Sequence, residues 1–241
     1  MALNKLAGTV AAITGGTRGI GRAIAERLLD EGVRVAICGT TRESVDRALE
    51  DLAGRGELLG EVADVSKLED VQRFVAATMA GFGRIDAFIN NAGVGMFRAA
   101  GDLTPEEWHR MIGVNLTGTY YCCHEILPIF RQQGSGDIVN ISSLAGKNPF
   151  AGGSGYNASK FGLNGFSEAM MLDHRNDGVR VSYVMPGSVA TEFGGHGADV
   201  GADWKIAPED VADVVQMLLE MPRRTTVSRV EIRPSRPARK S

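Results

Sequence analysis

Cysteine, proline and tryptophan are scarce in this chain of 241 residues, which holds 3, 8 and 2 of them. The cysteines are odd in number and, like the four histidines, show no metal-ligand spacing, so a disulfide scaffold is excluded and no metal is expected. No apolar run approaches the roughly 18 residues that span a bilayer, and no basic and apolar leader opens the chain. We therefore expect a cytoplasmic protein in a reducing compartment, without membrane contact.

Glycine is abundant, with 31 residues, and a glycine excess without proline is typical of tight turns and close backbone approaches. The formal net charge is −3, yet residues 223–241 carry seven basic side chains against one acid, Glu231. A basic tail can meet nucleic acid or an acidic partner, or it can be solvated. The acidic remainder of the chain argues against nucleic acid, so we expect a solvated tail.

Short β-branched runs alternate with longer segments of helical periodicity along the whole chain. The predicted strands are Thr9–Ile13, Val33–Cys38, Leu58–Val62, Ile85–Ile89, Asp137–Ile141, Val179–Val184 and Val227–Ile232. The predicted helices cover 20–31, 42–53, 67–80, 105–132, 157–176 and 208–220. This alternation predicts a doubly wound α/β fold of Rossmann type with a mostly parallel seven-stranded sheet. Because no repeat or linker interrupts it, we expect one domain over residues 1–232 and a basic tail over 233–241.

Helix signals support these placements, with one exception. Thr104, Pro105 and Glu107 predict a capping box with proline at the first helical position. Asn115, in contrast, falls in the middle of the 105–132 pattern. A short amide there competes with the backbone and is normally unfavourable, so this residue calls for a reason other than helix propensity.

The first predicted strand runs directly into a glycine-rich turn that reads Thr14-Gly15-Gly16-Thr17-Arg18-Gly19-Ile20-Gly21. Exposed backbone N–H groups at the start of a helix bind a pyrophosphate, and side chains at the glycine positions would block its approach. A glycine-rich turn alone is weak evidence, but its place between the first strand and a helix strengthens the interpretation. The spacing Gly-x-x-x-Gly-x-Gly differs from the common dinucleotide fingerprint Gly-x-Gly-x-x-Gly.

With this spacing the sequence resembles the short-chain dehydrogenase/reductase family of single-domain type, and further matches follow in order over residues 7–222. They are Asp64-Val65, Asn90-Asn91-Ala92-Gly93, Asn115, Ser143, Tyr156-x-x-x-Lys160, and Pro186-Gly187 with Thr191. The resemblance implies a nicotinamide dinucleotide cofactor held by Gly15, Thr17, Arg18, Gly19, Ile20, Gly21, Thr40, Asp64, Val65, Asn90, Tyr156, Lys160, Pro186, Gly187, Val189 and Thr191. It also implies a homotetramer or dimer built on the helices of 105–132 and 157–176 and the last strand.

The end of the second predicted strand bears on the choice between NAD and NADP. An NAD-selective site places an acid there, which binds the ribose 2′-hydroxyl and repels a 2′-phosphate. Here residues 38–42 hold no acid before Glu43. Arg18 and Arg42 can pair with a phosphate, helped by the Thr40 hydroxyl. We therefore expect NADP, with NADPH favoured over NADH.

Tyr156 and Lys160 are four residues apart at the start of a helix, which places them on one face. A tyrosine that moves protons near neutral pH needs a pKa below its ordinary value of about 10. An ammonium about 5.5 Å away, at an effective dielectric of about 20, is worth roughly 3 kcal/mol, or about two pKa units. We therefore expect Lys160 to lower the pKa of the Tyr156 phenol.

The family resemblance supplies the remaining roles of a four-residue catalytic set, Asn115, Ser143, Tyr156 and Lys160. It implies that Ser143 hydrogen-bonds the substrate oxygen, that Tyr156 protonates the forming alkoxide, and that Lys160 also holds the nicotinamide ribose. Asn115 would kink its helix and extend a proton path from Lys160 through a water. Ser142 should point away, because adjacent strand residues face opposite sides. The implied reaction is reversible hydride transfer between nicotinamide and a carbonyl carbon.

By the same resemblance, three stretches line the substrate pocket: residues 94–97, 144–150 and 193–196. They are mostly small or apolar, which favours a small, neutral, largely apolar ketone or aldehyde. The segment 192–207, with four glycines, is typical of a short lid.

Other functions remain open at this stage. Ketoacyl carrier-protein reductases resemble the chain closely, but Gly134 and Asp177 stand where their docking arginines are expected, with Arg131 and Arg175 nearby. A polyol or sugar reductase is a further alternative. So is an NADP-binding sensor or scaffold without turnover, although such relatives usually lose the tyrosine or the lysine that this chain keeps.

Overall fold

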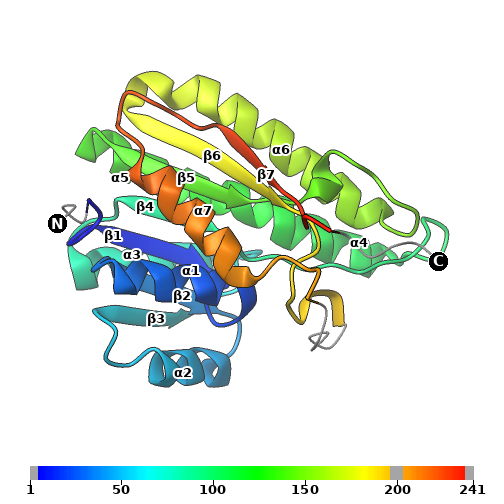
Figure 1. Cartoon of the computed structure of the whole chain (residues 1–241), viewed down its shortest axis with the longest axis horizontal. Coiled ribbons are helices and arrows are strands. Elements are labelled where there is room, and N and C mark those ends of the chain that lie inside the picture. The colour runs from blue at the N-terminus through cyan, green and yellow to red at the C-terminus, as the bar shows by residue number, and fades with distance from the viewer. Residues whose placement is uncertain (1–4, 196–202, 237–241) are drawn as a thin grey trace.

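Seven parallel strands form a single sheet in the order β3-β2-β1-β4-β5-β6-β7 (Figure 1). The computed structural model describes residues 5–195 and 203–236. The strands are β1 (Val10–Thr14), β2 (Arg34–Gly39), β3 (Leu58–Val62), β4 (Ala87–Asn90), β5 (Gly136–Ile141), β6 (Val179–Pro186) and β7 (Arg229–Ile232). The predicted doubly wound, seven-stranded, single-domain fold is confirmed.

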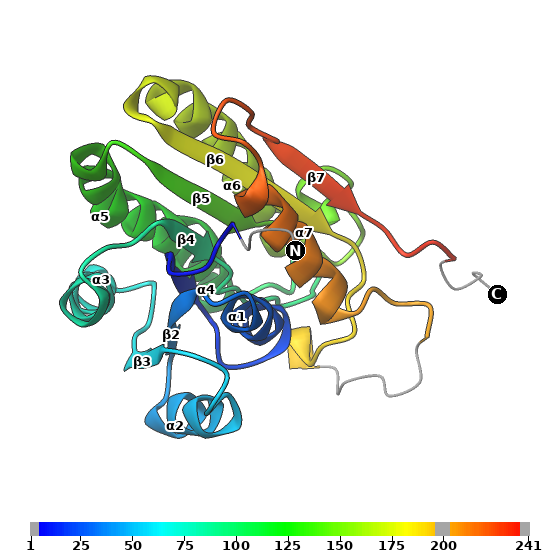
Figure 2. The same ribbon diagram turned by 60° about the vertical axis from the view of Figure 1, so that its left-hand side comes forward.

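The helices cover both faces of this sheet, as Figure 2 shows. They are α1 (Gly19–Asp30), α2 (Arg42–Asp51), α3 (Leu68–Phe82), α4 (Pro105–Ile112), α5 (Gly118–Gln133), α6 (Ser154–His174) and α7 (Pro208–Glu220). Buried residues of α1, α2 and α7 pack on one face, and those of α3, α5 and α6 pack on the other. The chain adds β2 and β3 on one side of β1 and then crosses to place β4 on the other side. Ligands of such folds bind at the carboxyl ends of the strands at this crossover point.

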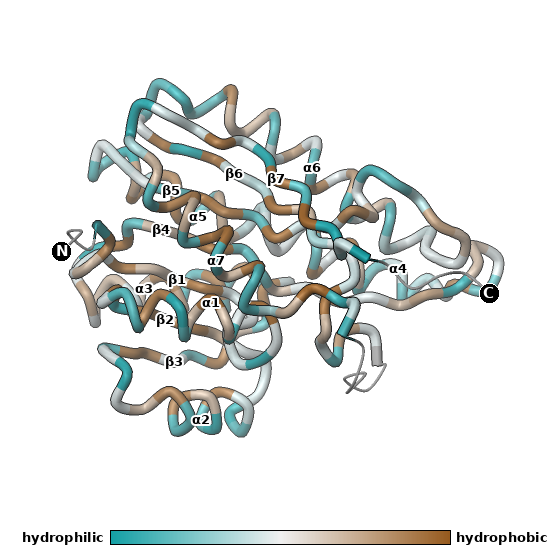
Figure 3. The backbone as a smooth tube through the Cα atoms, viewed as in Figure 1, coloured by the Kyte–Doolittle hydropathy of each residue, from teal (hydrophilic) through white to brown (hydrophobic). Residues whose placement is uncertain are grey.

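The strand β1 illustrates why the strands of this sequence are continuous apolar runs and do not alternate between apolar and polar residues. Val10 and Ala12 belong to the apolar cluster on one face, whereas Ala11 and Ile13 belong to the cluster on the other. All five residues of β1 are buried, because successive side chains point to opposite faces and both faces are covered. Figure 3 shows the same concentration of apolar residues along the strands.

The predicted helix over 105–132 is interrupted, which corrects the sequence-based expectation. The capping box at Thr104 forms as predicted, with Glu107 N donating to Thr104 Oγ1 at 3.2 Å and Thr104 N donating to Glu107 Oε2 at 3.1 Å. The helix α4 then ends at Ile112, and a π-helical turn over Gly113–Thr117 separates it from α5. Asn115 lies in this turn. Its unfavourable mid-helix position thus coincides with a local change of helix type, of the kind often found at functional sites.

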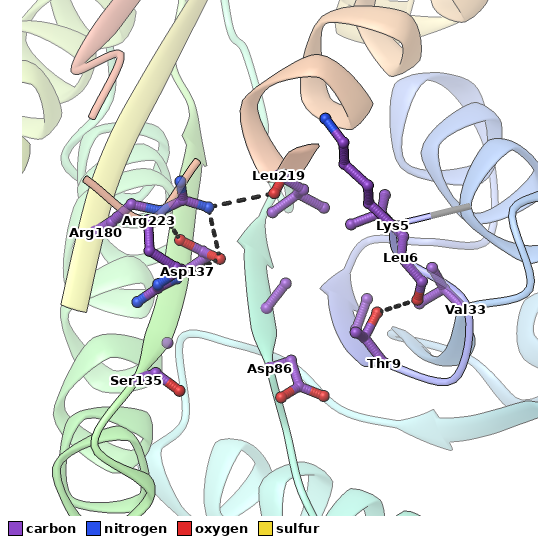
Figure 4. Close-up of a pocket in the computed structure, with 13 residues that line it drawn as sticks. Lys5, Leu6, Thr9, Val33, Asp86, Ser135, Asp137, Arg180, Leu219 and Arg223 are labelled. Atoms are coloured by element: carbon purple, nitrogen blue, oxygen red, sulfur yellow. Dashed lines mark hydrogen bonds and ion pairs between the residues drawn. The ribbon is translucent and has the colours of Figure 1, made fainter. Parts of the chain in front are cut away.

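At the amino ends of the strands, an ion-pair network closes a cavity of about 210 Å³ (Figure 4). Arg180 is buried and donates to both carboxylate oxygens of Asp137, at 2.5 and 3.0 Å. It also donates to the carbonyl of Leu219 at 3.3 Å, and Arg223 donates to Asp137 at 3.0 Å. These contacts fix the end of α7 to the sheet, at the edge opposite the glycine-rich turn.

The start of the predicted basic tail follows β7 without joining the sheet. Arg233 pairs with Glu231 at 2.8 Å, and Glu231 also accepts from Lys147 at 2.5 Å. Residues 237–241 lie outside the described part of the chain, as do residues 196–202 of the predicted lid. None of the helices in the described ranges combines the length and apolar character that crossing a bilayer requires. Those ranges also hold no cluster of three or more side chains that could bind a metal ion.

Candidate active site

The turn after β1 is shaped for close approach by a ligand. Gly15 and Gly19 have φ angles of +64° and +55°, a left-handed conformation that other residues rarely adopt. A β-carbon at Gly21 would lie 2.3 Å from the carbonyl oxygen of Gly15, so no larger residue fits there. Within the described residues no side chain caps α1, and its first turn contains no acid. The first amides of α1 are thus left for an anion, and the turn fits the pyrophosphate of a dinucleotide.

Thr191, which follows β6, lies beside the glycine-rich turn that follows β1. Its Cγ2 lies 3.3 Å from the place that a β-carbon of Gly19 would occupy. Pro186, Gly187 and Val189 lead to it from the end of β6, and Gly187 N donates to Ile232 O at 2.8 Å. These four residues, predicted for the cofactor site, therefore lie along one connection that passes over the start of α1.

Asn91 braces the glycine-rich turn, a role that the sequence analysis missed. Its side-chain amide donates to the carbonyls of Thr14 and Gly15, both at 3.0 Å, and its backbone N–H donates to Thr14 Oγ1 at 3.0 Å. Asn90, which was predicted as a cofactor ligand, instead directs its side chain into the sheet, where Nδ2 donates to Asn140 at 2.9 Å. The structure does not place the Asn90 side chain with the other predicted ligands. The presence of a second asparagine in the same motif was the sequence feature that could have indicated the role of Asn91.

The end of β2 lies beside the glycine-rich turn. A β-carbon at Gly39 would lie 2.6 Å from the side chain of Thr17, so Thr17 packs directly against the end of this strand. Thr40 is exposed. The Arg18 guanidinium is also exposed and lies 3.5 Å from Glu192, while Arg42 lies 3.5 Å from Asp46. Both candidate phosphate-binding arginines are thus held only by surface ion pairs, which contribute little and exchange readily for another anion.

Asp64 and Val65 follow β3, at the same carboxyl edge of the sheet as the glycine-rich turn. The Asp64 carboxylate accepts from the N–H and the hydroxyl of Ser66, at 3.0 and 2.7 Å. Val65 is buried, and a β-carbon at Gly118 would lie 2.9 Å from it. The start of α5 thus packs against Val65, and these contacts fix the turn between β3 and α3.

Ser143 follows β5, and Tyr156 and Lys160 lie in the first turns of α6. The three side chains come together at the carboxyl edge of the sheet. Tyr156 and Lys160 are 8% and 4% exposed, and Lys160 Nζ lies 5.9 Å from the centroid of the Tyr156 ring. The ammonium donates to the carbonyl of Ile141 at 2.9 Å. The Ser143 hydroxyl accepts from Ala145 N at 3.1 Å and donates to Pro186 O at 3.5 Å. The tyrosine and the lysine therefore share one helix face, as their spacing predicts.

The expected lowering of the phenol pKa is wrong for the polypeptide itself. Burial raises the pKa of Tyr156 to about 12, and the hydrogen bond with Ser143 offsets only part of this rise. Burial also lowers the pKa of Lys160 to about 8. Spacing along a helix gives the separation of two charges but not their desolvation, and here desolvation is the larger effect. The consequence is a neutral phenol at physiological pH, which is the form that donates a proton.

Asn115 connects three parts of the site. Its Oδ1 accepts from Val94 N at 2.8 Å, and its Nδ2 donates to Val94 O and to Ser159 Oγ, both at 2.9 Å. A β-carbon at Gly93 would lie 3.5 Å from Asn115 Oδ1 and 3.8 Å from Lys160 Nζ, so this glycine keeps the space between them open. The side chain therefore fixes the segment after β4 to α6 beside Lys160.

The family model described as short chain dehydrogenase matches residues 9–199. The chain belongs to the short-chain dehydrogenase family. Sulfoacetaldehyde reductase 2 from Chromohalobacter salexigens is 34% identical, over 94% of this chain and 94% of its own length. A putative ketoacyl reductase from Streptomyces coelicolor is 35% identical, over 85% and 80% respectively. A metagenomic short-chain oxidoreductase, solved in complex with NADP, superposes with a TM-score of 0.84 at 36% identity, covering 96% of this chain and 99% of that one.

As a short-chain dehydrogenase the chain is an oxidoreductase, and two further predictions about its site can be placed. Ser142 points away from the cleft, as expected, and donates to Asn164 Oδ1 at 2.5 Å. Arg131 and Arg175 lie at the far ends of α5 and α6, at the amino ends of the strands. Arg131 donates to Asp177 at 2.9 Å. Within this chain these cations are therefore remote from Tyr156 and do not flank the mouth of the site.

Proposed function

We propose that this short-chain dehydrogenase is an NADPH-dependent reductase that converts a small, largely apolar ketone or aldehyde to its alcohol, by a reversible reaction. The observation that carries the proposal is the group formed by half-buried Ser143 and buried Tyr156 and Lys160, which lies at the same carboxyl edge of the sheet as the glycine-rich turn. A nicotinamide dinucleotide, when bound, supplies the hydride. The glycine-rich turn would hold its pyrophosphate, and Lys160 its ribose hydroxyls.

The protein's own contribution is to polarise the carbonyl and to deliver a proton. The hydroxyls of Ser143 and Tyr156 donate hydrogen bonds to the substrate oxygen, where negative charge develops. Tyr156 then gives up its proton, because an alkoxide is a stronger base than a phenolate. The Lys160 ammonium, which is charged at neutral pH, stabilises the phenolate that remains. Tyr156 therefore acts as the general acid of the reduction.

The decisive experiment measures NADPH oxidation with a panel of acyl thioesters, quinones, ketosteroids, sugars and aromatic aldehydes. Turnover of at least one apolar carbonyl supports the proposal. Tyr156→Phe should lose at least about a hundredfold in kcat, since general acid catalysis contributes roughly that much, while the Kd for NADPH stays unchanged. Substantial residual turnover in this variant would contradict the proton-donor role.

The preference for NADPH follows from the charges at the end of β2. No acid stands there before Glu43, and Arg18 is exposed at the rim of the cleft. Its present partner, Glu192, is itself exposed, so a 2′-phosphate can replace it. The metagenomic relative solved with NADP agrees with this preference.

Replacing Arg18 tests that preference directly. Arg18→Ala should raise the Kd for NADPH by about tenfold or more and leave the Kd for NADH almost unchanged, because only NADPH carries the 2′-phosphate. Fluorescence titration of both cofactors measures the two constants. Arg47→Ala serves as a control, since Arg47 is an exposed arginine that pairs with Glu43 on α2. Equal weakening of NADPH and NADH by Arg18→Ala would remove Arg18 from the cofactor site.

A 3-oxoacyl carrier-protein reductase is the second candidate, and the similarity to the putative ketoacyl reductase of Streptomyces coelicolor favours it. The position of Arg131 and Arg175 argues against docking of an acidic carrier on this chain alone. The catalytic tyrosine and lysine argue against a third reading, an NADP-binding sensor or scaffold without turnover. Activity with carrier-bound, but not with free, oxoacyl thioesters would establish the second candidate.

We further propose a homotetramer or dimer in a reducing, cytoplasmic environment. Exposed apolar side chains gather on α5 and α6, where Tyr120 and Phe161 are 48% and 44% exposed. Tyr120 also contacts Phe166, with ring centroids 6.3 Å apart, so the two helices share one aromatic surface. The three cysteines are free and buried, which agrees with a compartment in which thiols stay reduced.

A further inference from the structure

Two phenylalanines contact the ring of Tyr156, and a third packs against one of them. We name Phe97, Phe150 and Phe193 the aromatic clamp. The rings of Phe97 and Phe193 both lie 5.6 Å from the Tyr156 ring, centroid to centroid. Phe97 meets Tyr156 edge to face, with an interplanar angle of 77°, and Phe150 lies 5.8 Å from Phe97. These separations and angles are those at which aromatic rings attract one another.

The members of the clamp come from three different connections at the carboxyl edge of the sheet. Phe97 follows β4, Phe150 follows β5 and Phe193 follows β6. They are 39%, 47% and 39% exposed, although each is a large apolar ring. Single exposed apolar residues need no explanation, but a contiguous group of them around a buried catalytic phenol marks a binding surface.

The backbone around the clamp is fitted to these rings. A β-carbon at Gly95 would lie 2.7 Å from the Phe193 ring, and one at Gly194 would lie 2.8 Å from the Phe97 ring. Gly194 also has a φ angle of +79°. Glycine at these two positions lets the connections after β4 and β6 approach each other through their aromatic side chains.

The charged side chains next to the clamp are already paired. Arg98 donates to Glu107 at 2.8 Å, and Lys147 donates to Glu231 at 2.5 Å. Glu192, which precedes Phe193, pairs with Arg18 at 3.5 Å, so the charged neighbours of the clamp in the described residues each have an ionic partner. An anionic or heavily hydroxylated substrate would lose its hydration against apolar rings without gaining a charged partner.

We infer that the aromatic clamp makes this site selective for uncharged carbonyl compounds whose carbonyl is attached to a flat aromatic ring. A planar ring that enters beside Tyr156 exchanges one ring contact for another and keeps the edge-to-face geometry. A flexible alkyl chain of the same size fills the space without those contacts and loses rotamer freedom as it binds. This inference rests on the proposed carbonyl reduction and names its substrate class.

The test uses three methyl ketones of equal heavy-atom count, bearing a phenyl, a cyclohexyl or an n-hexyl group. The quantity compared is the ratio of kcat/KM for the phenyl ketone to that for the n-hexyl ketone. Phe97→Leu and Phe193→Leu should each lower this ratio about three- to tenfold relative to the unmodified protein, because each removes one ring contact. Comparing the same ratio between variants cancels the different intrinsic reactivities of the ketones.

Phe161→Leu is the matched control, since Phe161 is an equally exposed phenylalanine that follows Lys160 on α6 and lies outside the clamp. It should leave the ratio unchanged. Dissociation constants of the same ketones, measured by calorimetry with NADP⁺ present, should show the same loss of preference without turnover. A ratio unaffected by both clamp substitutions overturns the inference even if turnover is normal. Absence of turnover with every carbonyl overturns the proposed reaction, and the dissociation constants then still decide whether the clamp prefers flat rings.

Discussion

At the scale of single residues, Lys160 combines a proposed catalytic role with an unfavourable environment. It is 4% exposed, and burial lowers its pKa to about 8 from the ordinary 10.5. Among the described residues its ammonium donates to the carbonyl of Ile141 and lies 5.9 Å from the centroid of the Tyr156 ring. A buried charge with so little compensation destabilises the fold, which is common where a residue is kept for chemistry rather than for stability.

Lys160→Met should therefore abolish turnover and stabilise the protein. The lowered pKa means that below pH 8 both folded and unfolded chains carry the charge, so the folded state bears the full desolvation penalty there. The penalty disappears as the pH rises from 8 to about 10.5, where the lysine is neutral in both states. After the loss of the hydrogen bond to Ile141 we expect a net gain of about 2 kcal/mol at pH 7 and almost none at pH 10.

Urea unfolding of the two proteins at both pH values measures this difference. Lys147→Met is the control, because Lys147 is exposed and its pair with Glu231 should contribute no more than about 1 kcal/mol. A lower stability of Lys160→Met at pH 7, or a gain that is equal at the two pH values, would show that the buried ammonium is well compensated.

At the scale of secondary structure, the sequence predicts elements well where the signal is local. All seven predicted strands and five of the six predicted helices lie within about three residues of the observed elements, because hydrophobic periodicity and caps such as that of Thr104 are properties of neighbouring residues. The interruption at Gly113–Thr117 was not predicted as a π-helical turn. Asn115 hydrogen-bonds Val94, which is 21 residues earlier in the chain. Local hydrophobic periodicity cannot predict a contact between residues so far apart in sequence.

Asn115→Ala should reveal what this long-range contact contributes. It would remove the side-chain partner of Val94 N and O and one of the two hydrogen bonds of the Ser159 hydroxyl, which still donates to Tyr156 O. Each buried polar group left without a hydrogen bond costs about 1–3 kcal/mol. Because the connection it holds carries Phe97, KM for the carbonyl should rise as well. Urea unfolding and steady-state kinetics measure the two effects. Asn148→Ala, an exposed asparagine, should change stability by less than about 0.5 kcal/mol, and equal effects would contradict the anchoring role.

The same distinction between local and distant signals applies to the site. The spacing of Tyr156 and Lys160 was sufficient to place them on one helix face, and the glycine-rich turn has the backbone shape that its sequence predicts. The pKa of Tyr156 was not predictable in this way, because burial depends on Phe97, Phe193 and other residues from distant parts of the chain. The role of the Asn91 side chain in bracing the glycine-rich turn was not predictable for a related reason. Which of two adjacent asparagines faces the cleft depends on the register of β4 in the sheet.

At the scale of the whole molecule, the outer surface of α5 and α6 keeps several exposed apolar side chains after the core is formed. Tyr120 and Leu172 are 48% and 55% exposed, on helices that pack beside each other on one face of the sheet. Light scattering at micromolar concentration should give the mass of a dimer or a tetramer. Tyr120→Lys should shift it to a smaller species, because a lysine in the centre of such an interface must be desolvated without a partner. Met217→Lys, at a 40% exposed position on α7 on the opposite face, should leave the mass unchanged. A monomer for the unmodified chain would show that this aromatic surface has another use.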